Sequence, residues 1–350
     1  PFECQTSVII KHQEKIASPE VIQSRYEDLG YICSHSVATS IYLACHLQKP
    51  ILIEGPPGVG KTELAKVTAA YLNVPLIRMQ CYEGLDESKA LYEWKYGKQL
   101  LYTQVLKEQL GDVLRGARGL DESIARLHDF GDIFYSQDFL EPRPLLQALQ
   151  SQEGAVLLID EIDKADQEFE AFLLELLSDY QVSIPEIGTV KAVSTPIVML
   201  TSNNTRELGD ALKRRCLHLY IPFPDAALES RILATQVEGL DAQLREQIVT
   251  LIGKLRDMPL KKLPAVSETI DWARALLLLN VEELDPHWVK ETLNLLLKFQ
   301  DDIELVEPDA GRIAYELFEG KRFRSGVGAK RSVEAIKDYT KAMEIIGHFY

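Results

Sequence analysis

The chain has 350 residues, of which 46% are hydrophobic and 26% charged, with a net charge of −15. These values are typical of a globular protein with more than one domain, and no apolar run is long enough to span a membrane. The acidic balance disfavours nonspecific nucleic-acid binding, because phosphate backbones are repelled. Five scattered cysteines without CxxC spacing, and an N-terminus unlike a signal peptide, predict reduced thiols in the cytoplasm.

Strands and helices alternate along the first two thirds of the chain. The sequence predicts helices over 19–29, 35–47, 61–72 and 166–180, strands over 51–53, 74–79, 155–159, 197–200 and 217–221, and a hairpin from 181–184 and 190–193. Residues 81–138 are predicted to form an insertion of helix and loop. This alternation indicates a mostly parallel sheet sandwiched by helices, an α/β class.

The pattern changes at Pro222 and Pro224, after which only helices are predicted. The expected organisation is an N-terminal helical extension (1–29), an α/β core (30–222), a small all-helical domain (223–300) and a tail (301–350). The tail carries a basic patch (Lys321, Arg322, Arg324, Lys330 and Arg331), which we interpret as a solvated helix flank or a partner contact.

A phosphate-binding loop follows the first strand and opens a helix. Its residues are Gly55, Pro56, Pro57, Gly58, Val59, Gly60, Lys61 and Thr62, followed by Glu63. Glycines let successive N–H groups and the helix N-terminus surround phosphates. In this arrangement Lys61 bridges the β- and γ-phosphates and Thr62 ligates Mg²⁺, so the sequence predicts binding of ATP with Mg²⁺.

Two carboxylates end the strand Val156–Ile159. Asp160 is positioned to hold Mg²⁺ through its water shell, and Glu161 to polarise the attacking water as a general base. The acidic run continues in Asp163 and Asp166, which we expect to cap and solvate the next helix.

Two further polar segments follow. Thr201–Asn204 lies at the carboxyl end of a strand, where ligands of parallel sheets bind, and an Asn there would orient the catalytic water. Arg214 and Arg215 precede the last strand, and an Arg at this point, exposed on one subunit, would reach the γ-phosphate of a neighbour.

These motifs resemble those of the AAA+ ATPases, and more narrowly the MoxR family, over residues 20–300. The stretches that carry the resemblance are GPPGVGKT, LLIDEIDKAD, LTSNNTREL and ALKRRC, with MQCYEGLD, ALYEW, RPLLQAL, FEAFLLE, IPEIGT and SETIDW. The last six are similar to the group that includes the CoxD protein of carbon monoxide dehydrogenase maturation.

The resemblance implies a hexameric ring with nucleotide between subunits and the all-helical domain as a lid. It implies sensor 1 at Asn203, with Asn204 as the alternative, and an arginine finger at Arg215, with Arg214 as the alternative. The adenine pocket would begin at Gly30, Tyr31 and Ile32. An insertion over 86–101 and the hairpin over 181–193 would face the pore or substrate side.

One departure concerns sensor 2, where family members carry Ser-x-Arg and this chain has Ser267-Glu268-Thr269. Arg274 could substitute only if its helix were rotated or shifted. Relatives commonly work with a partner that carries a von Willebrand factor A domain, and load metal centres into client proteins.

The leading hypothesis is therefore an ATP-driven chaperone that remodels or matures a partner protein. One alternative is a nucleic-acid motor, for which the hairpin residue Lys191 would line the pore. A second is a nucleotide-dependent scaffold with slow turnover, against which the presence of Lys61, Asp160, Glu161 and Arg215 argues.

Overall fold

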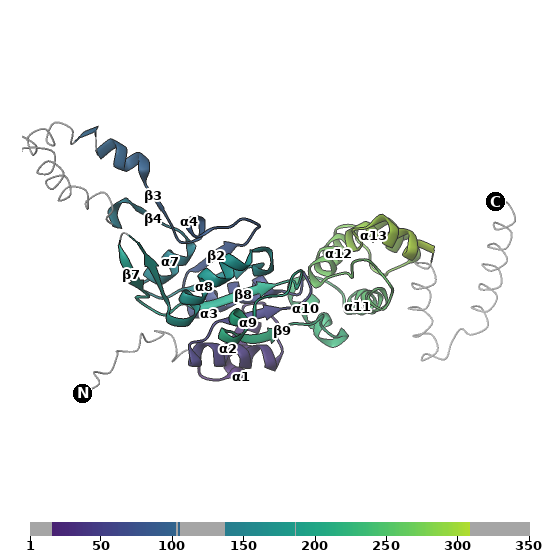
Figure 1. The fold of residues 1–350 in the computed structure, drawn as a ribbon. Coiled ribbons are helices and arrows are strands. Elements are labelled where there is room, and N and C mark those ends of the chain that lie inside the picture. The colour runs from purple at the N-terminus through teal and green to yellow at the C-terminus, as the bar shows by residue number, and fades with distance from the viewer. Residues whose placement is uncertain (1–15, 103, 106–136, 186, 309–350) are drawn as a thin grey trace, which may run out of the picture. The chain divides into compact units, whose positions relative to one another are not determined.

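The computed structural model describes residues 16–308, except 103, 106–136 and 186 (Figure 1). The chain divides into two compact units, residues 1–222 and residues 223–350. The predicted basic patch of the tail lies outside the described residues, as do parts of the N-terminal extension and the insertion. Within the described ranges, no helix has the length and apolar character needed to cross a membrane.

The first unit is built on a five-stranded sheet in which every pairing is parallel. The strand order is β2-β5-β8-β1-β9. The bounds are β1 Ile51–Glu54, β2 Leu76–Gln80, β5 Val156–Asp160, β8 Ile197–Ser202 and β9 Leu217–Tyr220. The predicted parallel sheet is confirmed, although its second strand begins two residues later than expected, after Pro75.

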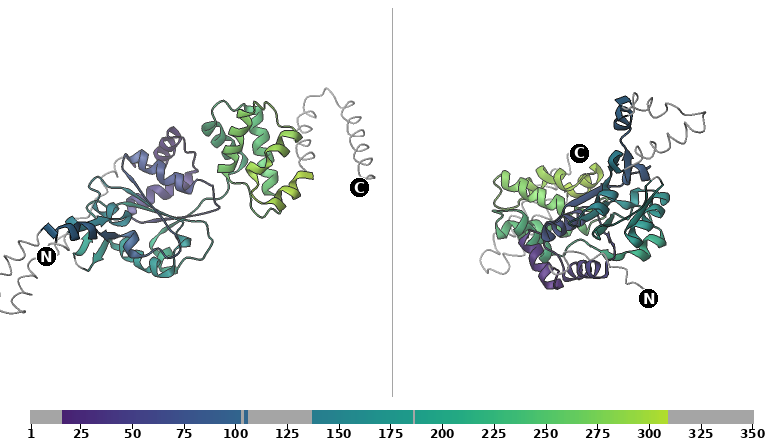
Figure 2. Two further views of the ribbon diagram at one scale, coloured as in Figure 1. Left: turned by 90° about the horizontal axis from the view of Figure 1, so that it is seen from above. Right: turned by 90° about the vertical axis from the view of Figure 1, so that its left-hand side faces the viewer.

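Helices cover both faces of this sheet, as Figure 2 shows. On one face α1 (Pro19–Asp28), α2 (His35–Leu47) and α3 (Lys61–Leu72) share a core with Val156 and Leu158. On the other face α7 (Pro144–Gln150), α8 (Gln167–Asp179) and α9 (Asp210–Arg215) share a core with Leu157 and Ile159. Alternate residues of β5 therefore serve opposite cores, which is why this strand is apolar throughout.

Side-chain caps fix where several helices begin. Ser18 accepts a hydrogen bond from Val21 at the start of α1, and Asp166 accepts one from Phe169 at the start of α8. Such caps satisfy N–H groups that have no partner within the helix.

Two short antiparallel pairs accompany the main sheet. Strand β3 (Tyr92–Trp94) pairs with β4 (Leu140–Pro142), and β6 (Gln181–Ile184) pairs with β7 (Gly188–Lys191). In the segment 81–138, predicted as helix and loop, α4 (Glu87–Ala90) agrees with the prediction, whereas β3 is a strand that was not predicted; its partner β4 follows that segment. Three-residue strands are too short for a period-two pattern to show in the sequence.

The second unit has a helical core of its own. Its helices are α10 (Ala226–Gln236), α11 (Ala242–Arg256), α12 (Val266–Leu278) and α13 (Pro286–Leu296). The indole of Trp272 is fully buried among them and donates a 2.7 Å hydrogen bond to the Thr292 hydroxyl.

Candidate nucleotide site

The loop Gly55–Thr62 joins β1 to α3 and takes backbone conformations that favour glycine. Gly55, Gly58 and Gly60 have φ of 152°, 74° and 93°. A Cβ on Gly55 would lie 2.2 Å from the Ile221 carbonyl oxygen at the end of β9. Gly60 begins α3 without a side-chain cap, so the first N–H groups of the helix are available to an anion.

Lys61 is buried at the base of this loop, with 6% of its surface exposed. Its ammonium donates to the carbonyls of Gly55 (2.6 Å) and Pro56 (2.8 Å) and to Asn203 Oδ1 (2.8 Å). Burial lowers the pKa of Lys61, and nearby carboxylates, Asp163 foremost, oppose this shift. A phosphate bound at the loop would have to compete with these three acceptors for the ammonium.

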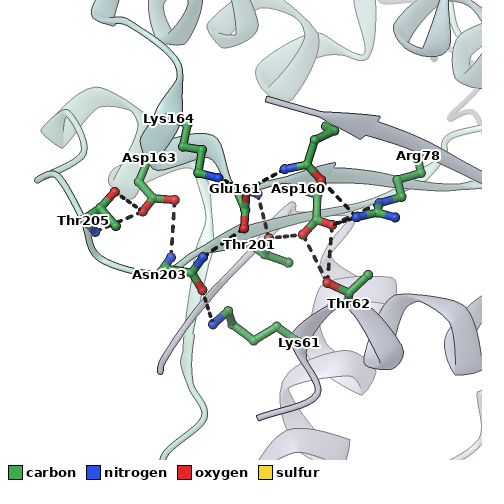
Figure 3. Close-up of polar contacts among 11 residues, drawn as sticks. Lys61, Thr62, Arg78, Asp160, Glu161, Asp163, Lys164, Thr201, Asn203 and Thr205 are labelled. Atoms are coloured by element: carbon green, nitrogen blue, oxygen red, sulfur yellow. Dashed lines mark hydrogen bonds and ion pairs between the residues drawn. The ribbon is translucent and has the colours of Figure 1, made fainter. Parts of the chain in front are cut away.

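Asp160 ends β5 next to the loop, and both of its oxygens accept hydrogen bonds (Figure 3). Thr62 Oγ1 lies 3.2 Å from Oδ1, and Thr201 Oγ1 lies 2.5 Å from the same atom. Arg78 donates to Oδ2 from Nε at 3.0 Å and from Nη2 at 2.6 Å. The carboxylate is only 4% exposed, so these donors replace its hydration.

Glu161 has a φ of 56°, which is strained for a residue other than glycine. Its N–H donates 2.9 Å to Thr201 Oγ1, which holds this conformation. Its Oε1 accepts from Asn203 Nδ2 at 3.2 Å, and its Oε2 from Gln80 Nε2 at 2.7 Å and Lys164 Nζ at 2.5 Å. A water approaching Glu161 must therefore exchange with these donors.

Asp163 does not solvate the next helix, as the sequence led us to expect, but lies 4% exposed beneath the Asn203 loop. It accepts from the N–H of Asn203 (3.3 Å), the N–H of Thr205 (3.0 Å) and Thr205 Oγ1 (2.6 Å). Burial alone would raise the pKa of Asp163, but these hydrogen bonds outweigh it and the pKa is lowered. The expected capping role does belong to Asp166.

The structure thus gathers Lys61, Thr62, Asp160, Glu161 and Asn203 at the carboxyl ends of three strands (Figure 3). Asn204, the alternative to Asn203, is exposed and has a φ of 62°. Its backbone N–H donates to the Ser202 hydroxyl and not to a residue of this group.

Sequence reasoning missed the contributions of Arg78 and Gln80. Strand β2 pairs with β5 so that Gln80 stands opposite Asp160, which places both side chains beside the acidic pair. A usable signal was present, because an Arg in a short strand needs a partner.

The other predicted residues of the loop's surroundings lie on its flanks. The ring of Tyr31 approaches Gly60, with its hydroxyl 3.4 Å from the Gly60 carbonyl, and Ile32 is buried with 8% exposure. Glu63 is at the surface of α3, where it pairs with Lys66 at 2.8 Å.

Arg215, at the end of α9, is not among the residues gathered around Lys61. Its Nε donates 2.5 Å to Ser178 Oγ on α8 and its Nη1 donates 3.1 Å to the Ala211 carbonyl. Arg214 beside it is exposed, whereas Arg215 is partly buried.

The second unit holds the two residues considered for sensor 2. Thr269, where the resemblance expects an Arg, is fully buried and donates to Glu229 Oε1 at 3.2 Å. Arg274 on α12 donates to the Gln236 carbonyl at 3.2 Å and pairs with Asp271 at 3.6 Å.

The donors present suit Mg²⁺. Mg²⁺ in nucleotide sites takes one or two protein oxygens and completes its shell with phosphates and water. Thr62 Oγ1 and the Asp160 carboxylate, 3.2 Å apart, are such a set. Among the described residues, no group of three or more His, Cys, Asp and Glu side chains forms a self-sufficient metal site.

Comparison with known proteins agrees with this geometry. Residues 50–216 match the family model of the AAA domain, dynein-related subfamily. Over this stretch, just under half of the chain, the protein is similar to an AAA domain. AAA domains bind nucleotide through such a loop and as a class hydrolyse it, which makes the residues gathered at the ends of β1, β5 and β8 the candidate nucleotide site.

Curated relatives extend over more of the chain than the AAA domain does. An uncharacterized protein of Staphylococcus aureus (strain bovine RF122 / ET3-1) is 29% identical over 238 residues, 66% of this chain and 76% of the relative. The uncharacterized protein YojN of Bacillus subtilis (strain 168) is 25% identical over 255 residues, 71% of this chain and 72% of the relative.

Among solved structures, this chain is similar to the RuvB Holliday junction branch migration motor of Thermotoga maritima. The TM-score is 0.41 at 15% identity, over 78% of this chain and 69% of RuvB. A likeness of this size adds nothing to what the strand order already shows.

Proposed function

We propose that this protein hydrolyses Mg²⁺-ATP and uses the energy to remodel a partner protein. The observation that carries the hydrolysis is the chain of hydrogen bonds from Lys61 through Asn203 to Glu161. It joins the group expected at the γ-phosphate to the group expected at the attacking water. In this mechanism Lys61 binds phosphate, Glu161 takes a proton from water, and Asn203 fixes the distance between them.

Bound Mg²⁺ would supply charge to the phosphates, held by Thr62 and Asp160. The protein's own part is to orient these two oxygens. Thr201 does so by donating to Asp160 and accepting from the N–H of Glu161, so a single hydroxyl sets both carboxylates.

The arginine that completes the site would come from a neighbouring copy. Arg215 contacts α8 of its own subunit and not the Lys61 site, which supports a role in trans. We therefore propose a ring, six-membered by resemblance to the MoxR family. A partner with a von Willebrand factor A domain and a metalloenzyme client follow from the same resemblance. Among the described residues, Cys33, Cys45, Cys81 and Cys216 form no disulfide, which supports a cytoplasmic location.

The hydrolysis proposal is tested with Glu161→Gln. We expect retained nucleotide binding and a loss of turnover of about 10²-fold or more. The control is Glu168→Gln, an exposed position in the first turn of α8, which should keep turnover. Turnover at the level of the unaltered protein in Glu161→Gln would reject Glu161 as the base.

The role in trans is tested by mixing variants. Arg215→Ala and Lys61→Ala should each lose turnover alone and regain part of it together, because mixed neighbours then form some complete sites. Arg214→Ala is the matched control and should remain active. Loss of activity in Arg214→Ala instead would move the finger by one residue, and no recovery in any mixture would reject the role in trans.

A further inference from the structure

Arg78 lies on one side of the acidic pair, opposite to Lys61 and Asn203 (Figure 3). It contacts Asp160 through two nitrogens of its guanidinium. Its side chain is 51% exposed, whereas that of Asp160 is 4% exposed, so the pair joins a buried anion to a solvated cation.

The same guanidinium is held in place from a second direction. Arg78 Nη2 donates 2.9 Å to Gln80 Oε1, and Gln80 Nε2 donates 2.7 Å to Glu161 Oε2. Strand β2 thus carries one connected set of hydrogen bonds that reaches both carboxylates of the site. This is a fixed arrangement, not a loose surface pair.

We propose that Arg78 is a positioning residue that acts as the counter-ion of Asp160 while no metal is bound, and that it thereby loosens the dependence of nucleotide binding on Mg²⁺. The inference rests on the nucleotide and metal binding of the proposed function, but not on hydrolysis.

Two buried or partly buried carboxylates beside a phosphate site repel an incoming nucleotide, and Arg78 neutralises the one closest to Thr62. When Thr62 and Asp160 hold a divalent cation, the guanidinium of Arg78 is still bound to Asp160 and repels the cation. Arg78 therefore strengthens metal-free binding and weakens the additional gain from Mg²⁺.

The competing explanation is that Arg78 only ties β2 to β5. That role predicts a change in thermal stability, but no change in the ratio of metal-free to metal-bound affinity. The two explanations therefore differ in a quantity that does not depend on turnover.

The experiment measures the Kd of a fluorescent ADP analogue in EDTA and in saturating Mg²⁺ at one ionic strength. In Arg78→Met we expect the Kd in EDTA divided by the Kd in Mg²⁺ to rise about threefold to tenfold. The Mg²⁺ concentration that gives half of the effect on the Kd should fall. Arg78→Gln has the same charge change and serves if Arg78→Met does not fold. Arg78→Lys keeps the charge and should stay within about twofold of the unaltered ratio.

Arg25→Met is the matched control, since it removes an exposed arginine whose partner is Asp28, 3.5 Å away on α1. Its ratio should not change. An unchanged or lower ratio in both uncharged Arg78 variants would overturn the inference while leaving hydrolysis intact. A raised ratio in a protein without turnover would uphold it and reject the proposed hydrolysis. Failure of the unaltered protein to bind nucleotide would reject both.

Discussion

The ammonium of Lys61 lies 2.8 Å from Asn203 Oδ1, although 142 residues separate them in the chain. The amide of Asn203 uses its other end on Glu161, with Nδ2 at 3.2 Å from Oε1. One neutral side chain therefore sets the distance between the ammonium of Lys61 and the carboxylate of Glu161.

Replacing Asn203 by Ala should lower turnover about 10²- to 10³-fold and change the nucleotide Kd by less than about threefold. The phosphate-binding loop is left intact, whereas Glu161 loses the amide that positions its carboxylate. Steady-state turnover and nucleotide titration measure the two effects. Asn204→Gly is the matched control, because glycine accepts the φ of 62° at that position, and it should retain turnover. The reverse pattern would transfer the role to Asn204.

Asp163→Asn should lower the free energy of unfolding of the first unit by about 1–3 kcal/mol, because the amide keeps only one acceptor oxygen and leaves either the Asn203 N–H or the Thr205 N–H without an acceptor. Turnover should fall as well, because the loop carries Asn203. Asp166→Asn is the control. Asp and Asn are both good N-cap residues, so the free energy of unfolding should change little when the N-cap of α8 is replaced in this way. Urea unfolding at pH 7 makes the comparison.

The same substitution has a pH signature. The folded pKa of Asp163 is lowered from an ordinary value of 3.8, so its stabilising effect is complete above that value and is lost as the pH falls through the lower, folded pKa. The difference between the unaltered protein and Asp163→Asn should therefore shrink on acidification below about pH 4. A difference that grows there would contradict the contacts described.

Gly55→Ala should destabilise the first unit by about 3 kcal/mol or more and abolish nucleotide binding. The added Cβ would meet the Ile221 carbonyl oxygen at 2.2 Å, and neither backbone can yield because both continue paired strands. Gly97→Ala is the control, since nothing lies within 4 Å of the Cβ it would gain. Thermal unfolding of both variants gives the result, and a well-folded Gly55→Ala would contradict the close approach.

In the second unit, Arg256→Met should cost about 3–5 kcal/mol, because it leaves the buried Glu229 carboxylate unpaired. Arg256 donates to both Glu229 oxygens, at 2.7 and 2.8 Å, and the two side chains are 11% and 2% exposed. Arg274→Met removes an exposed pair and should cost less than about 1 kcal/mol. Equal costs for the two variants would show that the buried pair contributes no more than a surface one.

The amino-acid sequence by itself determined the parallel sheet, the phosphate-binding loop and the two carboxylates after β5. The sheet follows from the alternation of apolar strands with helices, and the two motifs from an apolar strand followed within a few residues by glycines or acids. Such patterns are legible because backbone conformation and strand burial depend on neighbours in the chain.

Only the tertiary structure decided what surrounds those carboxylates. Arg78 and Asp160 are 82 residues apart, and Asp163 and Thr205 are 42 apart. Their contacts exist because β2 and β8 flank β5 in the sheet, a strand order that no local pattern records. Asp163, read from the sequence as a solvated acid, became the buried anchor of the Asn203 loop for the same reason: burial is a property of the assembled sheet and not of the residue.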